Sequence, residues 1–235
     1  MKPDLSKIPL SCQDCTNNSS TFSCLSSEEK DELSVDKGNN FYKKGQTIFY
    51  EGNHPHGLYC IHSGKVKISK LGEEGKEQIL RLAGKAETLG YRALLGNEPY
   101  KATATALEDS YVCYLSKRQF FELITKNNNL CLNMIHTLAD DLRDSEQKLL
   151  DISQLTAKER ISSALLILKD KFGYQEDGKT IDVKLTRREL GEFSGVTTET
   201  TIRTLSELNK ENVIELKGKE IQILDEKNLT HRLHH

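Results

Sequence analysis

The sequence lacks the features that would place the protein in a membrane or outside the cell. It contains no apolar run of the about 18 residues needed to span a bilayer. The start, "MKPDLSKIPL", also lacks the apolar core of roughly 7–15 residues that an export signal requires. The 235 residues are 36% hydrophobic and 29% charged, which is typical of a globular chain of one large or two small domains. We therefore expect a cytoplasmic protein with no membrane partner.

A large positive charge is missing as well, because the formal net charge is −2. Any contact with nucleic acid must therefore come from a local basic patch. No nucleophile–base set and no glycine-rich phosphate loop occurs, so we identify no catalytic residues. The rival function class is a thiol or metal-dependent enzyme on a β-roll. A metal enzyme of the cupin type would need clustered ligands, and His54, His56 and His62 do not form such a set.

Glycine is absent from Asn97–Phe172, whereas ten of the 15 glycines lie within Gly38–Gly96. In that stretch, "GLYCIHSGKVKISKLGEEGKEQILRL" alternates apolar and polar residues, with turns predicted at Ser63–Gly64 and Glu74–Gly75. "KATATALEDSYVCYLS" continues with β-branched and aromatic residues. Many short strands at this spacing predict a small barrel or jelly roll.

Helical spacing replaces this alternation after Ser116, where "KRQFFELITKNNNLCLNMIHTLADDLRDSEQKLLDISQL" contains neither glycine nor proline. Residues separated alternately by 3 and 4 positions form an a/d seam, which suits two helices packed side by side. A helix packed on its own domain is the alternative. Ser145 is the polar position on the seam and could make a dimer adjustable. The predicted interface residues are Ile135, Leu138, Leu142, Ser145, Leu149 and Ile152.

The carboxyl-terminal third contains the most specific pattern, "LTRRELGEFSGVTTETTIRTLSELNKENVIELKGKEIQIL". Thr186 and Glu189 form a capping box that begins a helix. Gly191 permits close helix packing, and Gly195 lies where a helix-turn-helix makes its tight turn. A hairpin follows and is predicted to turn at Lys217–Gly218. Together these signals predict a helix-turn-helix with a β-hairpin beside it.

The second helix of this motif carries the residues predicted to read DNA. Thr197 can cap it, and its amino-terminal end is the part that enters the major groove. Arg203 has the planar fork that matches O6 and N7 of guanine, and Glu199 can accept from a cytosine amino group. An ordinary surface helix with a salt bridge between these two residues is the alternative. The predicted DNA-binding residues are Thr198, Glu199, Ile202 and Arg203, with Arg187, Arg188, Lys217 and Lys219 near phosphates.

A β-roll, a long helix and a terminal helix-turn-helix in this order resemble the Crp/Fnr superfamily of bacterial transcription regulators. "KKGQTIFYEGN", "LYCIHSGKVKI" and "GKEQIL" match its roll, and "LTRRELGEFSGVTTETTIRTLSEL" matches its helix-turn-helix. In the family, the positions of Glu199 and Arg203 read a G·C pair. Thr201 and Thr204 stand where the family often has larger apolar residues.

The resemblance covers nearly the whole chain and implies an α+β fold. The expected parts are a cyclic-nucleotide-binding-type β-roll (jelly roll), a long dimerisation helix and a winged helix-turn-helix. It further implies a homodimer on a palindromic operator in double-stranded DNA, with RNA polymerase as a further partner. The segments we expect are 1–25 with the amino-terminal cysteines, the sensor roll 26–126, the dimerisation helix 127–155 and the DNA-binding domain 156–235.

The resemblance does not extend to the residues with which family members bind cyclic AMP. Those members use an acidic residue beside a turn in the roll and an Arg-Ser pair further on. Here the matching residues are Thr88, with Glu87 adjacent, and then Lys101 and Ala102. Lysine lacks the bidentate fork of arginine, so we do not expect a cyclic nucleotide.

The amino-terminal "SCQDC" supplies Cys12 and Cys15. In a reducing cytosol, clustered cysteines more often form a metal or redox centre than structural disulfides. The resemblance to the oxygen-sensing branch of the family implies a 4Fe–4S cluster with four thiolate ligands. The eight residues between Cys15 and Cys24 exceed the family's spacing, and Cys60 is a competing ligand. The implied ligands are Cys12, Cys15, Cys24 and Cys113.

Other interpretations of the cysteines stay open at this point. Four thiolates would also hold Zn²⁺. The Cys-x-x-Cys pair alone could be a redox dithiol, and Cys60 and Cys131 could be small buried hydrophobic residues. The protein could also be a Crp/Fnr-type regulator without a cluster that senses another small ligand.

Overall fold

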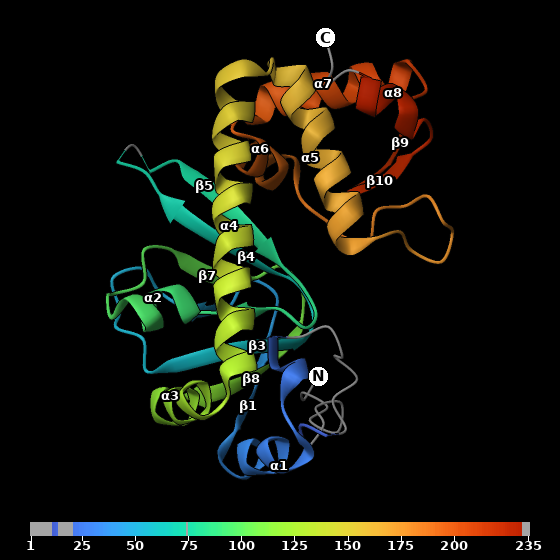
Figure 1. Cartoon of the computed structure of the whole chain (residues 1–235). Helices are drawn as coiled ribbons and strands as arrows, with labels where there is room; N and C mark the ends of the chain where they lie inside the picture. The colour runs from blue at the N-terminus through green and yellow to red at the C-terminus, as the bar shows by residue number, and fades with distance from the viewer. Residues whose placement is uncertain (1–10, 14–20, 74, 232–235) are drawn as a thin grey trace. The chain divides into compact units, whose positions relative to one another are not determined.

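The computed structural model describes residues 11–13, 21–73 and 75–231 (Figure 1). Their contacts divide them into two compact units. One unit holds the described residues up to Lys70 together with Arg81–Arg143, and the other holds Leu71–Leu80 together with the residues from Asp144 onward. The predicted α+β class, with strands, then a long helix, then a helix-turn-helix and hairpin, is confirmed. Within the described ranges, no helix combines the length and apolar character of a membrane span.

Two four-stranded sheets build the predicted roll. The first sheet has the order β1 (Gly38–Tyr42), β8 (Ser110–Ser116), β3 (Gly57–Ser63) and β6 (Thr88–Leu89). The second has the order β2 (Thr47–Phe49), β7 (Thr103–Ala106), β4 (Val66–Leu71) and β5 (Glu77–Ala83). The turn predicted at Ser63–Gly64 joins β3 to β4. Gly64 has a φ of 100°, and an added Cβ would lie 2.2 Å from Ser110 Oγ, so only glycine fits this turn.

Apolar side chains from both sheets meet in an inner core. Ile61 of β3, Val66 of β4, Ala104 of β7 and Val112 of β8 are all fully buried there. Because side chains alternate between the two faces of a strand, the residues on either side of Ile61 and Val112 belong to the opposite face of the first sheet. That outer face carries the cysteines considered below.

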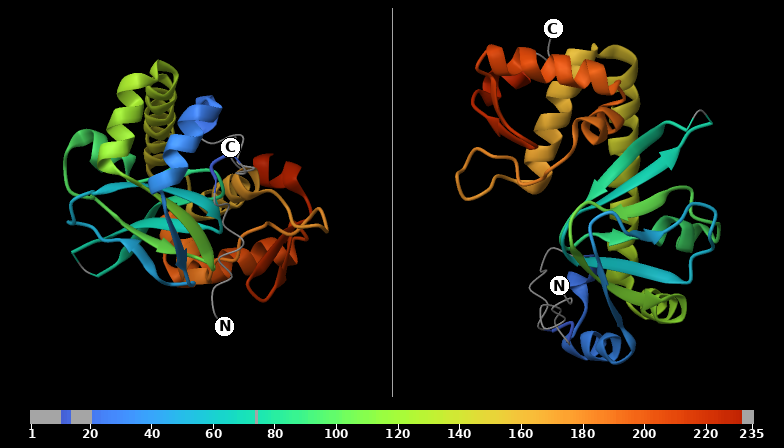
Figure 2. Two further views of the ribbon diagram at one scale, coloured as in Figure 1. Left: turned by 90° about the horizontal axis from the view of Figure 1, so that it is seen from below. Right: turned by 180° about the vertical axis from the view of Figure 1, so that it is seen from behind.

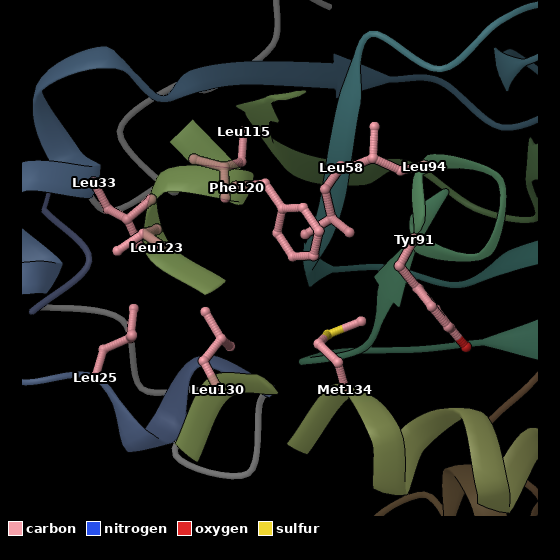
Figure 3. Packing of buried hydrophobic residues seen from close by; sticks show 10 residues of the cluster. All are labelled: Leu25, Leu33, Leu58, Tyr91, Leu94, Leu115, Phe120, Leu123, Leu130 and Met134. Atoms are coloured by element: carbon pink, nitrogen blue, oxygen red, sulfur yellow. The ribbon is translucent and has the colours of Figure 1, made fainter. Parts of the chain in front are cut away.

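A second core layer covers the outer face of the first sheet (Figure 3). Leu58 of β3 and Leu115 of β8 contribute from the sheet, and the buried Phe120 points toward Leu58. Residues of neighbouring helices complete the layer, which we call the outer core. Those helices are α1 (Ser27–Asp36), α2 (Tyr91–Gly96), α3 (Lys117–Lys126) and α4 (Asn128–Gln154), preceded by the short 3₁₀ helix η2 (Thr21–Cys24).

Side-chain hydrogen bonds fix where these helices begin. Ser116 caps α3 in a capping box with Gln119. Asn127 lies just before α4, where its Oδ1 accepts from the Leu130 amide at 3.0 Å. Its Nδ2 donates to both carboxylate oxygens of Glu29 at 2.9 Å. The start of α4 is therefore tied to α1.

A polar network joins β5, α2 and α4 within the first unit. Arg81 donates to the Tyr91 hydroxyl and to Asp141 Oδ1, both at 2.7 Å, and Tyr91 donates to the other carboxylate oxygen of Asp141. Burial raises the pKa of Tyr91 to about 12, so the phenol remains a donor. Burial lowers the pKa of Arg81, but Tyr91 and Asp141 outweigh this effect and raise it. Each of these three groups therefore forms a hydrogen bond with both of the others.

The second unit is a helical bundle with a two-stranded hairpin, β9 (Ile214–Lys217) and β10 (Glu220–Ile223), which follows α7 (Figure 2). The hairpin turns at Gly218, whose φ is 62°, as predicted at Lys217–Gly218. Leu165 of α5, Leu190 of α6 and Leu205 of α7 are buried between the helices. The helices are α5 (Ala157–Phe172), α6 (Arg187–Ser194), α7 (Thr198–Lys210) and α8 (Glu226–His231).

We predict that Asp141→Ala lowers the free energy of unfolding by about 3 kcal/mol, because it leaves the charge of Arg81 without its counter-ion. The value lies at the low end for buried pairs because the side chains of Arg81 and Asp141 are 28% and 15% exposed. Urea denaturation measures the change. Asp140→Ala is the matched control, since the Arg143–Asp140 pair is 71% and 60% exposed and should contribute less than about 1 kcal/mol. Equal losses of unfolding free energy in the two variants would contradict the proposed contribution of the network to stability.

Candidate nucleic-acid interface and cysteine site

The helix-turn-helix predicted from the sequence is present in α6 and α7. Thr186 Oγ1 accepts from the Glu189 amide at 3.1 Å, and Glu189 Oε2 accepts from the Thr186 amide at 2.7 Å. This reciprocal pair confirms the capping box at the start of α6. Gly195 ends the helix with a φ of 68°, in the left-handed region that favours glycine, which confirms the predicted turn.

Close contact between the two helices seats α7 firmly. A Cβ at Gly191 would lie 2.8 Å from both Thr201 Oγ1 and the Val196 carbonyl oxygen, so no larger residue fits there. Thr201 is 0% exposed, and its hydroxyl donates to the Thr197 carbonyl at 2.9 Å. Thr204 is also buried. The small threonine side chains at these two positions therefore allow α7 to pack closely against α6.

The predicted base-reading residues lie on the outer side of α7. Thr197 caps the helix by accepting from the Thr200 amide at 3.2 Å. Glu199, Ile202 and Arg203 are exposed, and their i, i+3 and i+4 spacing places them on one face of the first turns. The helix thus presents an acceptor, an apolar side chain and a bidentate donor at its amino-terminal end. Thr198 is partly buried beside them.

Arg187 links the start of α6 to the tip of the hairpin. Arg187 donates to the Gly218 carbonyl at 2.9 Å, and burial lowers the pKa of this half-buried side chain. Arg187 therefore holds the hairpin tip, in addition to its predicted role near phosphate. Lys217 pairs with Glu215 at 3.3 Å, whereas Lys219 is exposed beside the turn.

Two more basic residues near this surface are paired with carboxylates. Arg188 forms an ion pair with Glu192 at 2.6 Å, and Lys184 forms one with Glu220 at 2.7 Å. The Lys184–Glu220 pair is largely exposed and contributes only about 0–1 kcal/mol, so Lys184 can exchange Glu220 for a phosphate at little cost. Arg188 differs, because the side chain of Glu192 is only 9% exposed, and a move of Arg188 to a phosphate would leave this carboxylate buried without its counter-ion.

The predicted seam forms an exposed apolar stripe along α4. Ile135, Leu142, Leu149 and Ile152 are between 45% and 68% exposed. Leu138 differs, because it packs against the outer core of its own unit. An exposed apolar stripe on a helix 27 residues long is typical of a surface that binds another protein chain.

Four of the cysteines that the structure describes lie on the outer face of the first sheet or pack against the outer core. Cys60 of β3 and Cys113 of β8 are direct partners in the antiparallel ladder. Each lies two residues from Leu58 or Leu115 and therefore faces the same side of the sheet. Cys12 and Cys24 pack against the outer core, and the Cys12 amide donates to Ser34 Oγ at 2.7 Å. Cys15 lies outside the described residues.

These cysteines are half-buried. Cys60 and Cys131 are thus more exposed than small core residues would be. Burial raises the pKa of the Cys24 thiol. Among the described residues, no group of three or more His, Cys, Asp or Glu side chains is placed to hold a metal ion.

Asn39 adds a polar group that the sequence does not single out. It is the direct partner of Cys113 on β1, and its Oδ1 is buried without a hydrogen-bond partner. Only the pairing of distant strands brings Asn39 and Cys113 together. The alternation of residues along "GNNFY" could have indicated on which face of the strand Asn39 lies, but not that its partner is Cys113.

The positions that match cyclic AMP ligands in the family are occupied differently here. Thr88 is buried, and Glu87 Oε2 accepts from the Gly84 amide within its own turn at 2.7 Å. Lys101 forms an exposed ion pair with Glu98 at 3.2 Å. Lys101, the cation at the position that would meet the cyclic phosphate, is therefore paired with a carboxylate of its own turn.

Two protein families match separate parts of the chain. The family described as "Cyclic nucleotide-binding domain" matches residues 40–127, and the family described as "Crp-like helix-turn-helix domain" matches residues 159–232. Together they account for most of the chain.

Known relatives match the chain over most of its length. The chain is 28% identical over 217 residues to the "Transcriptional activator protein FnrA" of Stutzerimonas stutzeri, covering 91% of this chain and 88% of that protein. It is 29% identical over 215 residues to the "Fumarate and nitrate reduction regulatory protein" of Escherichia coli, covering 90% and 86%. The solved structure of FixK2 from Bradyrhizobium japonicum shares the fold, with a TM-score of 0.76, 21% identity and coverage of 83% and 96%.

Proposed function

Because the chain belongs to the Crp/Fnr superfamily of transcription regulators, we propose that it binds a palindromic DNA site as a homodimer and senses oxygen in the cytoplasm. The observation that carries the DNA-binding part is the exposed face of Glu199, Ile202 and Arg203 on a closely seated α7. The amino-terminal end of α7 enters the major groove, and Arg203 donates two hydrogen bonds to guanine. RNA polymerase is the partner through which a bound regulator acts.

Two helices α4, one from each subunit, form the dimer through the exposed stripe. Pairing removes Ile135, Leu142 and Leu149 from water, which is the main driving force for association. The two-fold axis of the dimer then matches the axis of the palindrome. Ser145 lies within the stripe and weakens the pairing, so the dimer responds to small changes elsewhere.

The proposed sensor is a 4Fe–4S cluster held by Cys12, Cys15, Cys24 and Cys113. Cys12 and Cys24 pack against the outer core, and Cys113 lies on the sheet face that this core covers, which supports a common site. The unpartnered Oδ1 of Asn39 supports it further, because the amide turned by 180° would present its NH₂ to the Cys113 thiolate. When bound, the cluster supplies an oxygen-labile centre.

The outer core also supports a route from the cysteines to α4. Cys12 and Cys24 pack on the same layer as Leu130 and Met134 of α4. A change in how the amino-terminal cysteines are held therefore alters the packing beneath α4. We infer that ligation of these cysteines favours the dimer and that its loss favours the monomer. A shift of about 1.4 kcal/mol changes this equilibrium tenfold.

We predict that Arg203→Ala weakens binding to the operator by about 1–3 kcal/mol and relaxes preference at one base pair per half-site. Gel shifts on a set of operator variants measure both effects. Lys219→Ala is the control, because loss of a phosphate contact should weaken binding to all sequences and reduce the salt slope by about 1. An unchanged base preference after Arg203→Ala would show that another face reads the DNA.

We predict that Leu142→Asp yields monomers that bind the operator weakly, because it places a charge in the centre of the apolar stripe. Leu142 is 61% exposed in the single chain, so the substitution should not disturb folding. Analytical ultracentrifugation measures the dimer fraction. His136→Asp adds the same charge on another exposed face of α4 and should leave the dimer intact. A dimer that survives Leu142→Asp would move the interface away from α4.

We predict that protein purified without oxygen is brown and contains iron and sulfide near four per chain. Serine at any one of Cys12, Cys15, Cys24 and Cys113 should remove the colour, whereas Cys60→Ser and Cys131→Ser should retain it. Absorption spectra and iron analysis provide the measurement. A colourless protein that binds DNA equally well with and without air would refute the oxygen sensor and leave the DNA-binding proposal intact.

A further inference from the structure

Cys60 and Cys113 lie directly opposite each other on the two central strands of the first sheet. The Ile61 amide donates to the Glu87 carbonyl and the Ile61 carbonyl accepts from the Ala86 amide, both at 2.9 Å. Since both backbone groups of Ile61 point toward the β6 side, those of Cys60 point toward β8. The two cysteines therefore form a hydrogen-bonded pair, whose Cα atoms stand about 5.5 Å apart. This separation falls within the about 4.4–6.8 Å range of disulfides.

We propose that Cys60 and Cys113 are a reversible redox pair, which a peroxide oxidises to a disulfide between β3 and β8. Both residues are half-buried thiols on the outer face of the sheet, so a molecule as small as hydrogen peroxide has a path to them. Leu58 and Leu115, their neighbours on the same face, hold the two strands in this register by packing in the outer core.

The reaction takes place in two steps. The thiolate of one cysteine attacks the O–O bond of hydrogen peroxide, which forms a sulfenic acid and releases hydroxide. The sulfur of the second cysteine then attacks the sulfenic sulfur, forms the S–S bond and expels the sulfenic oxygen as water. In total, two thiols lose two protons and two electrons, and one peroxide is reduced to two waters.

The disulfide should be easy to reduce. Directly opposite Cβ atoms stand about 4.5–5.5 Å apart, whereas a disulfide brings them to about 3.8 Å. The bond therefore draws β3 toward β8, and strained disulfides have more oxidising potentials. The irregular register between Ile61 and Ser63 gives β3 a place to absorb the displacement. Cellular thiols can thus reset the pair.

The pair would give the protein a second input beside oxygen, and this consequence rests on the proposed function. A Cys113 sulfur bonded to Cys60 is no longer a thiolate and cannot serve as an iron ligand. Peroxide would then block assembly of the cluster until the disulfide is reduced. Cys60 is not among the proposed iron ligands, and its role is to bond Cys113 so that Cys113 cannot ligate iron.

The experiment uses the full-length chain, freed of iron, reduced with dithiothreitol and desalted without oxygen. Hydrogen peroxide is added at one equivalent, remaining thiols are blocked with N-ethylmaleimide, and digested peptides are mapped by mass spectrometry. We expect a cross-linked peptide that joins Cys60 to Cys113 and disappears with dithiothreitol. Cys60→Ala and Cys113→Ser should abolish it, and Cys131→Ser, the matched control, should retain it. Recovery of both residues as maleimide adducts, or a Cys113 bond to Cys12, Cys15 or Cys24, would overturn the proposal.

A second measurement separates this inference from the cluster. After a peroxide pulse, iron and sulfide are added without reductant and the absorption is recorded. The unsubstituted protein should lose its ability to assemble a cluster, and Cys60→Ala should keep it. Equal loss in both proteins would overturn the role of Cys60. A chain that forms the cross-link but never turns brown would refute the cluster alone, whereas a brown protein without the cross-link would refute the redox pair alone.

Discussion

The first sheet is covered on both faces, and the placement of the other parts of its unit depends on this constraint. Ile61 and Val112 fill the inner core, while Leu58 and Leu115 on the same strands fill the outer core. Burial of each such side chain is worth about 1.5–3 kcal/mol, so a shift of register by one residue would forfeit both layers. The register that the two cores impose is also what sets Cys60 opposite Cys113.

The Arg81–Tyr91–Asp141 network adds a directional constraint to these apolar layers. Apolar contacts alone tolerate rotation of a helix, because burial depends little on direction. Arg81 donates to Tyr91 and to Asp141 at 2.7 Å, Tyr91 donates to Asp141, and these directional bonds fix which side of α4 faces the roll. With Asp141 turned inward, the adjacent Leu142 is left facing solvent at the centre of the stripe.

The proposed DNA-reading surface depends on a separate steric constraint. Gly191 lets α7 approach α6 until Thr201 is fully buried, and the polar hydroxyl is satisfied by its own helix. The opposite side of α7, with Glu199 and Arg203, is then held outward. Arg187 fixes the hairpin by its bond to Gly218. Close packing therefore holds α7 and the hairpin in place, whereas the side chains proposed to contact DNA are exposed.

The sequence by itself determined the features that depend on neighbours in the chain. The capping box of Thr186 and Glu189, the turn at Gly195 and the long helix α4 follow from local hydrogen bonds and periodicity, which the order of residues specifies directly. Tertiary structure alone decided that Asn39 and Cys60 flank Cys113, that Arg81 meets Asp141, and that Leu138 turns toward its own core. These contacts join residues far apart in the chain, and the packing of complete layers, rather than any local pattern, selects the register and rotation that bring them together.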